Sequence, residues 1–196
     1  RHTSFLPVSG LGDVYKRQVP EFVHKLRPEH WILIGLTVLA AGLRFATLGS
    51  QSYWFDEAQS AHEFGLSFGG MWSFMVSHES NPPLYFVLGW LWAKPFGLGA
   101  VSLRFFSALA GTALIPVLYL AGRELISSRA GLVAAALATV NPFLIWYSQE
   151  AREYMLLALL CAASLLYFAR FLNRRTSHEV AGWAVFSGLA VLTHAF

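Results

Sequence analysis

Residues 31–48 read WILIGLTVLAAGLRFATL, an apolar run in which Arg44 is the single charged residue. A helix rises 1.5 Å per residue, so this run covers about 27 Å, which is close to the hydrocarbon thickness of a bilayer. Lys25 and Arg27 precede it, and the positive-inside rule holds such residues in the cytoplasm. The run therefore predicts a transmembrane helix that begins on the cytoplasmic side.

The composition extends this prediction to the whole chain. Of the 196 residues, 56% are hydrophobic, 15% aromatic and 13% charged, whereas a soluble domain has about 25% charged residues. Four further apolar runs are expected to span the membrane: 101–121, 130–146, 154–172 and 180–196. We therefore expect an all-α membrane protein, a polytopic helical bundle.

The charge distribution argues against a nucleic-acid partner. The formal net charge is +3, but the basic residues lie in short clusters between apolar runs, as loop charges do under the positive-inside rule. The one cysteine, Cys161, lies inside an apolar run and can form no intrachain disulfide, so the redox compartment cannot be read from it. Membrane lipids are the expected surroundings.

The sequence at each end of the chain leads to a different prediction. Asp13-Val-Tyr-Lys-Arg-Gln18 matches the translation of GATGTGTATAAGAGACAG, which resembles a transposon end used in sequencing libraries. We therefore expect residues 1–18 to be foreign to the protein and residues 19–196 to be its transmembrane domain. Because the chain stops at Phe196 inside an apolar run, we expect this domain to be the N-terminal part of a longer protein.

Residues 49–99 are rich in aromatic, glycine and polar residues and are expected to form one outer loop. The apolar run Leu84–Ala93 within it is too short to span and is typical of an interfacial helix, with Tyr85 and two tryptophans suited to the interface. Asn81-Pro82-Pro83 is a helix-start signal before it. If this run does not span, three basic loops fall on one side: Lys25 and Arg27; Arg123 and Arg129; and Arg170, Arg174 and Arg175.

The pair Asp56-Glu57 stands just after the first span, in Tyr53-Trp-Phe-Asp-Glu-Ala-Gln59. Ionisable groups at a membrane edge are costly to keep and are functional candidates for that reason. The alternative is a solvated acidic pair in the first turn of a helix, where the helix dipole favours it. We take this pair as the centre of a candidate active site.

Other polar residues on the same side are candidates with structural alternatives. His78 and Glu79 are weak candidates for a divalent metal ion, and a solvated loop histidine is the favoured interpretation of His78. Glu150 and Arg152 are two positions apart and would not face each other on a helix. Arg152 suits a phosphate through its planar fork, or it could contact lipid headgroups from a hydrated turn.

Three further ionisable residues are expected to be structural. Arg44 and Arg104 lie near the outer ends of spans, where we expect their side chains to snorkel to the interface. His194 is expected to face the interior of the bundle.

Three motifs in order resemble the membrane glycosyltransferases of the GT-C fold. They are Asp56-Glu57, the segment His78 to Phe86 with its Asn-Pro-Pro-Leu-Tyr-Phe, and Asn141-Pro-Phe-Leu-Ile-Trp-Tyr-Ser-Gln-Glu-Ala-Arg-Glu-Tyr154. The resemblance is to a family 39-like subgroup, related to protein O-mannosyltransferases and lipid A aminoarabinose transferases, and it runs from about Trp31 to the end. The subgroup often has His or Lys where this chain has Asn81.

The resemblance implies transfer of a sugar from a polyprenyl-phosphate donor to a lipid, glycan or protein acceptor, at the outer face of a bacterial-type inner membrane. It carries the family's loop carboxylate onto Asp56, with Glu57 beside it. Donor or acceptor contacts are expected from the motif residues His78, Asn81, Gln149, Glu150, Arg152 and Tyr154. They are also expected from Arg104, for which the structural role is the alternative. No cofactor is assigned, and a divalent metal ion is possible.

The expected chemistry needs one carboxylate. A glycosidase uses a second one to protonate a poor leaving group, but a polyprenyl phosphate leaves readily, so Asp56 suffices as general base on an acceptor hydroxyl. A secondary transporter or lipid-linked sugar flippase is the alternative, and it predicts charges at span centres and inverted repeats. A non-catalytic assembly subunit is a third possibility.

Overall fold

The computed structural model describes residues 27–78 and 82–194 of the chain. Within these residues the protein is made of helices and contains no strand, which confirms the all-α prediction. The helices are α3 (Pro28–Phe45), α4 (Phe55–Gly65), α5 (Phe68–His78), α6 (Leu84–Phe96), α7 (Ala100–Leu125), α8 (Ser128–Val140), α9 (Pro142–Ser148), α10 (Tyr154–Arg174) and α11 (Ser177–Val191). The expected foreign segment 1–18 lies outside the described residues.

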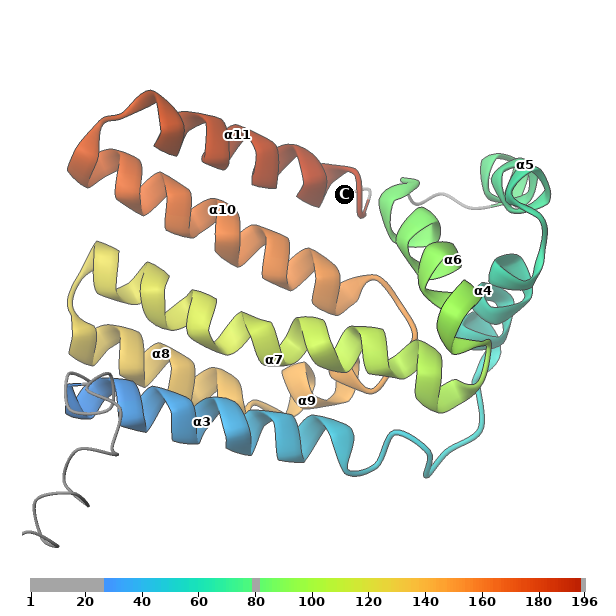
Figure 1. Cartoon of the computed structure of the whole chain (residues 1–196), viewed down its shortest axis with the longest axis horizontal. Helices are drawn as coiled ribbons and strands as arrows, with labels where there is room; N and C mark the ends of the chain where they lie inside the picture. Colours follow the sequence, from blue (N-terminus) through green and yellow to red (C-terminus); the bar gives the residue numbers. More distant parts are fainter. Residues whose placement is uncertain (1–26, 79–81, 195–196) are drawn as a thin grey trace, which may run out of the picture.

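Helices α3, α7, α8, α10 and α11 lie side by side in a bundle (Figure 1). Helix α7 packs against α3, α8 and α10, and α10 packs in turn against α11. The three helices α4, α5 and α6, here called the cap helices, gather at one end of this bundle. The connection from α3 to α4 and the turn from α9 to α10 reach the same end, and the candidate site forms where they meet.

Two described helices, α7 and α10, are each long and apolar enough to cross a membrane, with mean hydropathies of 1.8 and 2.1. Helices α8 and α9 together form a third candidate if they are counted as one bent span. Helices α3 and α11, which include most of two expected spans, do not reach this length and apolarity over their described residues. The protein is a multi-pass membrane protein.

The expected span 130–146 is interrupted at Asn141, where the chain bends by 60° between α8 and α9. Pro142 disfavours a helical conformation at the residue before it, and Asn141 is extended, with φ −65° and ψ 120°. The Asn141 Oδ1 accepts a hydrogen bond of 3.1 Å from the Leu144 N–H and so caps the new helix. The bend turns α9 and the residues after it toward α3 and α7.

Helices α7 and α8 approach closely because small residues face each other. A Cβ added to Gly131 would lie 2.4 Å from the Tyr119 carbonyl oxygen, and one added to Gly122 would lie 2.8 Å from the Gly131 Cα. Small residues let helix backbones meet in this way in membrane bundles. This contact fixes α8, and with it α9, against α7.

The expected outer loop 49–99 contains the three cap helices α4, α5 and α6. Helix α6 includes the apolar run 84–93 and continues to Phe96. Its Tyr85 is 1% exposed and packs in a core with Phe64 and Phe86, so the expectation that Tyr85 lies at the interface is wrong. The tertiary packing of the cap helices gives this ring a buried position that hydropathy alone does not reveal.

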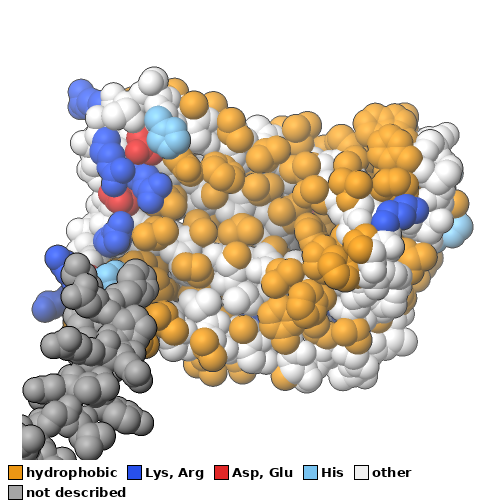
Figure 2. Space-filling view, viewed as in Figure 1, with side chains coloured by type: hydrophobic (Ala, Val, Ile, Leu, Met, Phe, Trp, Pro, Cys, Tyr) orange, Lys and Arg blue, Asp and Glu red, His pale blue; other side chains and the backbone are white. Residues whose placement is uncertain are grey.

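Basic side chains gather at the other end of the bundle, away from the cap helices (Figure 2). Glu124 at the end of α7 lies at their centre, 3.4 Å from Arg123, 3.8 Å from Arg170 and 3.3 Å from Arg174. The turns between α7 and α8 and between α10 and α11 lie at this same end. Two of the three expected basic loops, the one between α7 and α8 and the one between α10 and α11, therefore lie at the same end of the bundle.

Arg44 does not snorkel, and this expectation is wrong. Its side chain is fully buried and donates hydrogen bonds to the carbonyl oxygens of Ala40 (3.2 Å), Ala138 (3.0 Å) and Thr139 (3.3 Å). Ala138 and Thr139 lie in the last turn of α8, where carbonyl groups lack helical partners because the helix ends. Arg44 thus joins α3 to the end of α8.

Candidate active site

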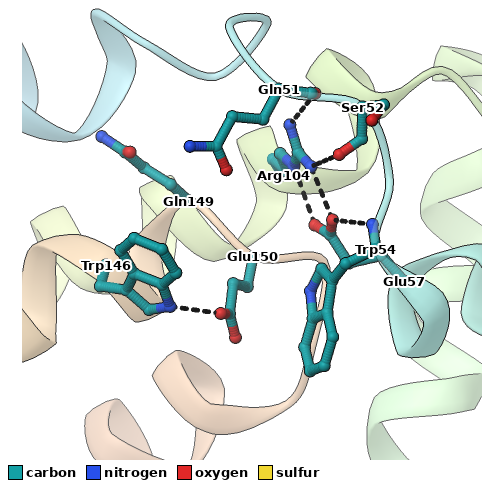
Figure 3. Close-up of a pocket in the computed structure, with 8 residues that line it drawn as sticks. All are labelled: Gln51, Ser52, Trp54, Glu57, Arg104, Trp146, Gln149 and Glu150. Carbon is teal, nitrogen blue, oxygen red and sulfur yellow. Dashed lines mark hydrogen bonds and ion pairs between the residues drawn. The ribbon is translucent and has the colours of Figure 1, made fainter.

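A cavity of about 440 Å³ opens where the bundle meets the cap helices (Figure 3). Its walls come from the connection between α3 and α4, the first turns of α4 and α7, and the end of α9 with the turn after it. Eight residues line it: Gln51, Ser52, Trp54, Glu57, Arg104, Trp146, Gln149 and Glu150. Four of the sequence-predicted site residues are among them.

Arg104 and Glu57 form a buried bidentate ion pair at one wall of the cavity. Arg104 donates from Nη2 to Glu57 Oε2 at 2.6 Å and from Nε to Oε1 at 2.8 Å. It also donates to the carbonyl oxygens of Leu48 (2.9 Å), Gln51 (2.8 Å) and Ser52 (3.0 Å). These bonds use all five N–H donors of the guanidinium, so its expected snorkelling is wrong.

Glu57 binds further groups with the same two oxygens. Its Oε1 accepts a hydrogen bond of 2.8 Å from the Ala151 N–H, and its Oε2 accepts a longer one of 3.4 Å from the Trp54 N–H. One carboxylate therefore holds the start of α4, the start of α7 and the turn after α9 together.

Asp56 is the second residue of α4 and is half-buried. Within the described residues its carboxylate makes no hydrogen bond or ion pair, although its backbone oxygen accepts a bond of 3.1 Å from Ser60. It is not one of the eight lining residues, but its charge acts on Glu150, which is one. The two acids of the Asp-Glu pair therefore differ, since one is fully bonded and the other is not.

Glu150 presents a carboxylate to the cavity. The Trp146 Nε1–H donates to its Oε1 at 2.5 Å, and its Oε2 is buried without a hydrogen-bond partner among the described residues. Burial raises the pKa of this carboxyl above its ordinary value, the negative charges of Glu57 and Asp56 add to the rise, and the Trp146 bond and the charge of Arg152 oppose it. Glu150 thus has a free acceptor atom in a partly desolvated place.

Arg152 and Tyr154 do not line the cavity. Arg152 is 7% exposed, with its Nε 3.2 Å from Glu153 Oε2 and its Nη1 donating to the Ser60 hydroxyl at 3.4 Å. Glu153 is fully buried and also lies 3.4 Å from His194 Nδ1. The Tyr154 ring packs at 6.3 Å from the His194 ring. The His194 imidazole thus faces the interior of the protein.

His78 lies at the exposed end of α5, where its ring stacks on Phe74 at 4.4 Å and its Nδ1 lies 2.9 Å from the Ser77 hydroxyl. It does not line the cavity. Glu79 and Asn81 are outside the described residues, so the expected metal pair and the expected contact of Asn81 have no structural account. In the described ranges, no three His, Cys, Asp or Glu side chains gather as metal ligands would.

Gln149, which was expected in the site, lines the cavity and donates from Nε2 to the Leu43 carbonyl at 3.1 Å. Sequence reasoning missed Gln51, Ser52, Trp54 and Trp146. A signal existed for Trp146, because a residue four positions before Glu150 can share its helix face. Trp54 could have been identified as a site residue because it lies two positions before Asp56 in the sequence.

Tyr53 supports the same region from outside the cavity. Its hydroxyl donates to the Leu98 carbonyl at 2.7 Å, which ties the start of α4 to the end of α6. Burial, together with the negative charge of Glu57, raises its pKa to about 12, against the lowering effect of Arg104. The tyrosine is therefore a neutral hydrogen-bond donor at physiological pH.

The comparisons with known proteins give one match. Residues 80–196, more than half of the chain, match the family described as dolichyl-phosphate-mannose-protein mannosyltransferase. No curated protein and no solved structure gives a significant match. The matched range includes Arg104, Gln149 and Glu150 of the cavity, whereas Asp56 and Glu57 precede it.

Proposed function

The chain belongs to the dolichyl-phosphate-mannose-protein mannosyltransferase family, and from this premise we propose that it transfers a sugar from a polyprenyl-phosphate donor to an acceptor hydroxyl at the outer membrane face. The family match carries the reaction class, a glycosyltransferase of the GT-C type. The geometry of the Asp-Glu pair supports the roles of individual residues. The acceptor is a lipid, a glycan or a protein.

The outer location is supported by the separation of charge along the bundle. Basic side chains gather at the end opposite the cap helices, and the positive-inside rule assigns such an end to the cytoplasm. The cavity lies at the other end, between α4, α7 and α9. A lipid-linked sugar presented at the outer face would reach it there.

The proposed base is Asp56, because the residue is half-buried and its carboxylate is unbonded within the described residues. In the step, Asp56 takes the proton of the acceptor hydroxyl, and the acceptor oxygen forms a bond to the anomeric carbon of the sugar. The bond from that carbon to the phosphate oxygen breaks, and polyprenyl phosphate leaves with the electron pair. Glu57 is a positioning residue in this proposal, because Arg104 and two backbone N–H groups already occupy its oxygens.

The developing phosphate charge needs a counter-charge. Arg104 offers none, because its donors are all used in the ion pair and in three carbonyl contacts. Arg152 is the proposed phosphate contact, and in that role the phosphate would share the guanidinium with Glu153, which lies 3.2 Å from its Nε. In this proposal the donor phosphate binds next to Arg152.

The test is transfer itself. Membranes containing the full-length protein are supplied with polyprenyl-phosphate mannose that carries a radiolabel in the sugar, and the label is followed into lipid, glycan and protein fractions. Label in one of these fractions, and none in membranes lacking the protein, is the expected result. A protein that is inserted and binds the donor but moves no label into any fraction would contradict the proposal.

A further inference from the structure

The cavity has two tryptophan side chains on its walls that are more exposed than aromatic residues in a core. Trp54 is 45% exposed and Trp146 is 59% exposed, and both line the cavity with Glu150 drawn between them (Figure 3). The π face of an indole carries negative partial charge. The C–H groups on one face of a pyranose ring carry positive partial charge, so such a ring stacks well on an indole.

The free oxygen of Glu150 is the second observation. Its Oε2 is buried and has no hydrogen-bond partner among the described residues, while Oε1 is already bonded to Trp146. A buried acceptor left unpaired costs free energy, and a donor that entered the cavity would recover it. A sugar hydroxyl is such a donor, and the amides of Gln51 and Gln149 and the hydroxyl of Ser52 offer further polar contacts on the same walls.

The charge of the cavity indicates whether it would bind the sugar or the phosphate of a lipid-linked donor. Among the described residues, Arg104 is the one cation on the cavity wall, and its five N–H groups all donate to Glu57 or to three carbonyl groups. The remaining charged wall residue, Glu150, would repel a phosphate. The cavity therefore suits an uncharged, hydroxyl-rich group and not an anion.

We propose that this cavity is a subsite for one pyranose ring, which stacks against Trp54 and Trp146 and donates a hydroxyl hydrogen bond to Glu150 Oε2. The volume of about 440 Å³ lies within the range of about 300–1,000 Å³ for small-molecule sites. The inference deepens the proposed function and rests on it for the class of substrate. The ring comes from the donor or from a glycan acceptor, and the experiment separates these two sources.

The first arm measures equilibrium binding to the full-length protein in nanodiscs, with polyprenyl-phosphate mannose and bare polyprenyl phosphate as probes. If the ring belongs to the donor, the wild type binds the mannosylated lipid more tightly. Trp54→Ala and Trp146→Ala each then lower that preference about 3- to 10-fold, the effect of losing one aromatic contact. Affinity for bare polyprenyl phosphate stays unchanged. Trp146→Phe keeps much of the preference, because it keeps a ring to stack on.

The second arm uses methyl α-D-mannoside in the presence of saturating polyprenyl phosphate. If the ring belongs to an acceptor, the tryptophan variants leave the donor preference intact but weaken binding of this mannoside by the same factor. The matched control is Trp31→Ala, a tryptophan of similar exposure (50%) at the start of α3, which changes neither binding. If neither probe responds to Trp54→Ala or Trp146→Ala, the subsite is overturned.

The outcomes for the subsite and for the proposed function can be told apart. Asp56→Asn should lower transfer about 10²- to 10⁴-fold while the sugar preference remains, because Asp56 is not a wall residue of the cavity. If the protein transfers sugar but its sugar binding is unaffected by Trp54→Ala and Trp146→Ala, the proposed function stands and the subsite is contradicted. If sugar binding depends on both tryptophans but the protein transfers no sugar, the subsite stands and the proposed function is contradicted.

Discussion

Glu57 and Arg104, 47 positions apart in the sequence, meet in a buried ion pair with an Nη2 to Oε2 distance of 2.6 Å and side chains that are 1% and 5% exposed. Around this pair are gathered the carbonyl groups of residues 48, 51 and 52 and the N–H of Ala151. The pair is therefore the joint between the cap helices and the bundle, and the cavity forms beside it.

Glu57→Gln should strongly destabilise the protein. The substitution keeps the size of the side chain but leaves the Arg104 charge buried and unpaired, which costs about 3–5 kcal/mol. The matched control is Glu29→Gln in the exposed pair Arg27–Glu29, where the side chains are 78% and 27% exposed and the loss should be about 0–1 kcal/mol. Unfolding of both variants in detergent checks this, and equal losses would contradict the role of the pair.

Gly111→Ala should destabilise the protein through a clash between α7 and the end of α9. A Cβ at Gly111 would lie 2.2 Å from the Ser148 hydroxyl oxygen and 3.1 Å from Arg44 Nε. Forcing an atom into such a contact costs about 1–3 kcal/mol. Gly42→Ala in α3 is the control, since nothing lies within 4 Å of its added Cβ and alanine favours a helix by about 0.5–1 kcal/mol. In thermal unfolding, the melting temperature should be lower than wild type for Gly111→Ala and higher than wild type for Gly42→Ala.

The all-α membrane fold was predictable from sequence because apolar length and scarcity of charge are local properties of the chain. The bend at Asn141 also had a local signal, since an Asn-Pro pair starts a helix. The burial of Arg44 and Tyr85 had none, because it depends on α8 and on the cap helices packing over these side chains. Hydropathy predicts that a residue lies in the membrane region, but it does not predict which other side chains or helices pack against that residue.

The candidate site was predictable only in part. Glu57, Gln149 and Glu150 were named from motifs, and Arg104 was named as a charged residue near the end of a span. All four line one cavity, but no pattern showed that Glu57 and Arg104 would bind each other. That pairing depends on the path of the connection from α3 to α4, which brings three carbonyl groups to Arg104. Trp54 and Trp146 were missed because tryptophans in a membrane protein are usually found in contact with lipid or in the core.

Glu150→Gln should change the pH dependence of stability. Because burial raises the pKa of Glu150 in the folded protein above its ordinary value of 4.5, the folded state holds more protons than the unfolded state in the window above that value. Stability then falls as pH rises through the window. The glutamine variant lacks this loss, so its melting temperature relative to wild type should be higher at pH 7 than at pH 4.

The control for this experiment is Gln149→Ala, a neighbouring wall residue that does not titrate. Its melting temperature should differ from that of wild type by the same amount at both pH values. A difference between Glu150→Gln and wild type that does not change with pH would show that the Glu150 carboxyl is fully hydrated in the folded protein.

The cap helices should lie outside the membrane on the outer side. Ser67→Cys, just before α5, and Ser128→Cys, at the start of α8, place thiols at the two ends of the bundle in a Cys161→Ala background. In intact cells an impermeant thiol reagent should label position 67 and leave position 128 unlabelled until the cells are opened. Labelling of position 128 but not position 67 in intact cells would reverse the topology.

The central claim is that Asp56, and not Glu57, accepts the proton of the acceptor. The most direct measurement is single-turnover sugar transfer by folded, membrane-inserted Asp56→Asn, with donor binding followed separately. We expect transfer to fall about 10²- to 10⁴-fold, the usual contribution of a general base, while donor binding stays at the wild-type level. Transfer by Asp56→Asn at nearly the wild-type rate would contradict the claim and leave the residue a structural part of α4.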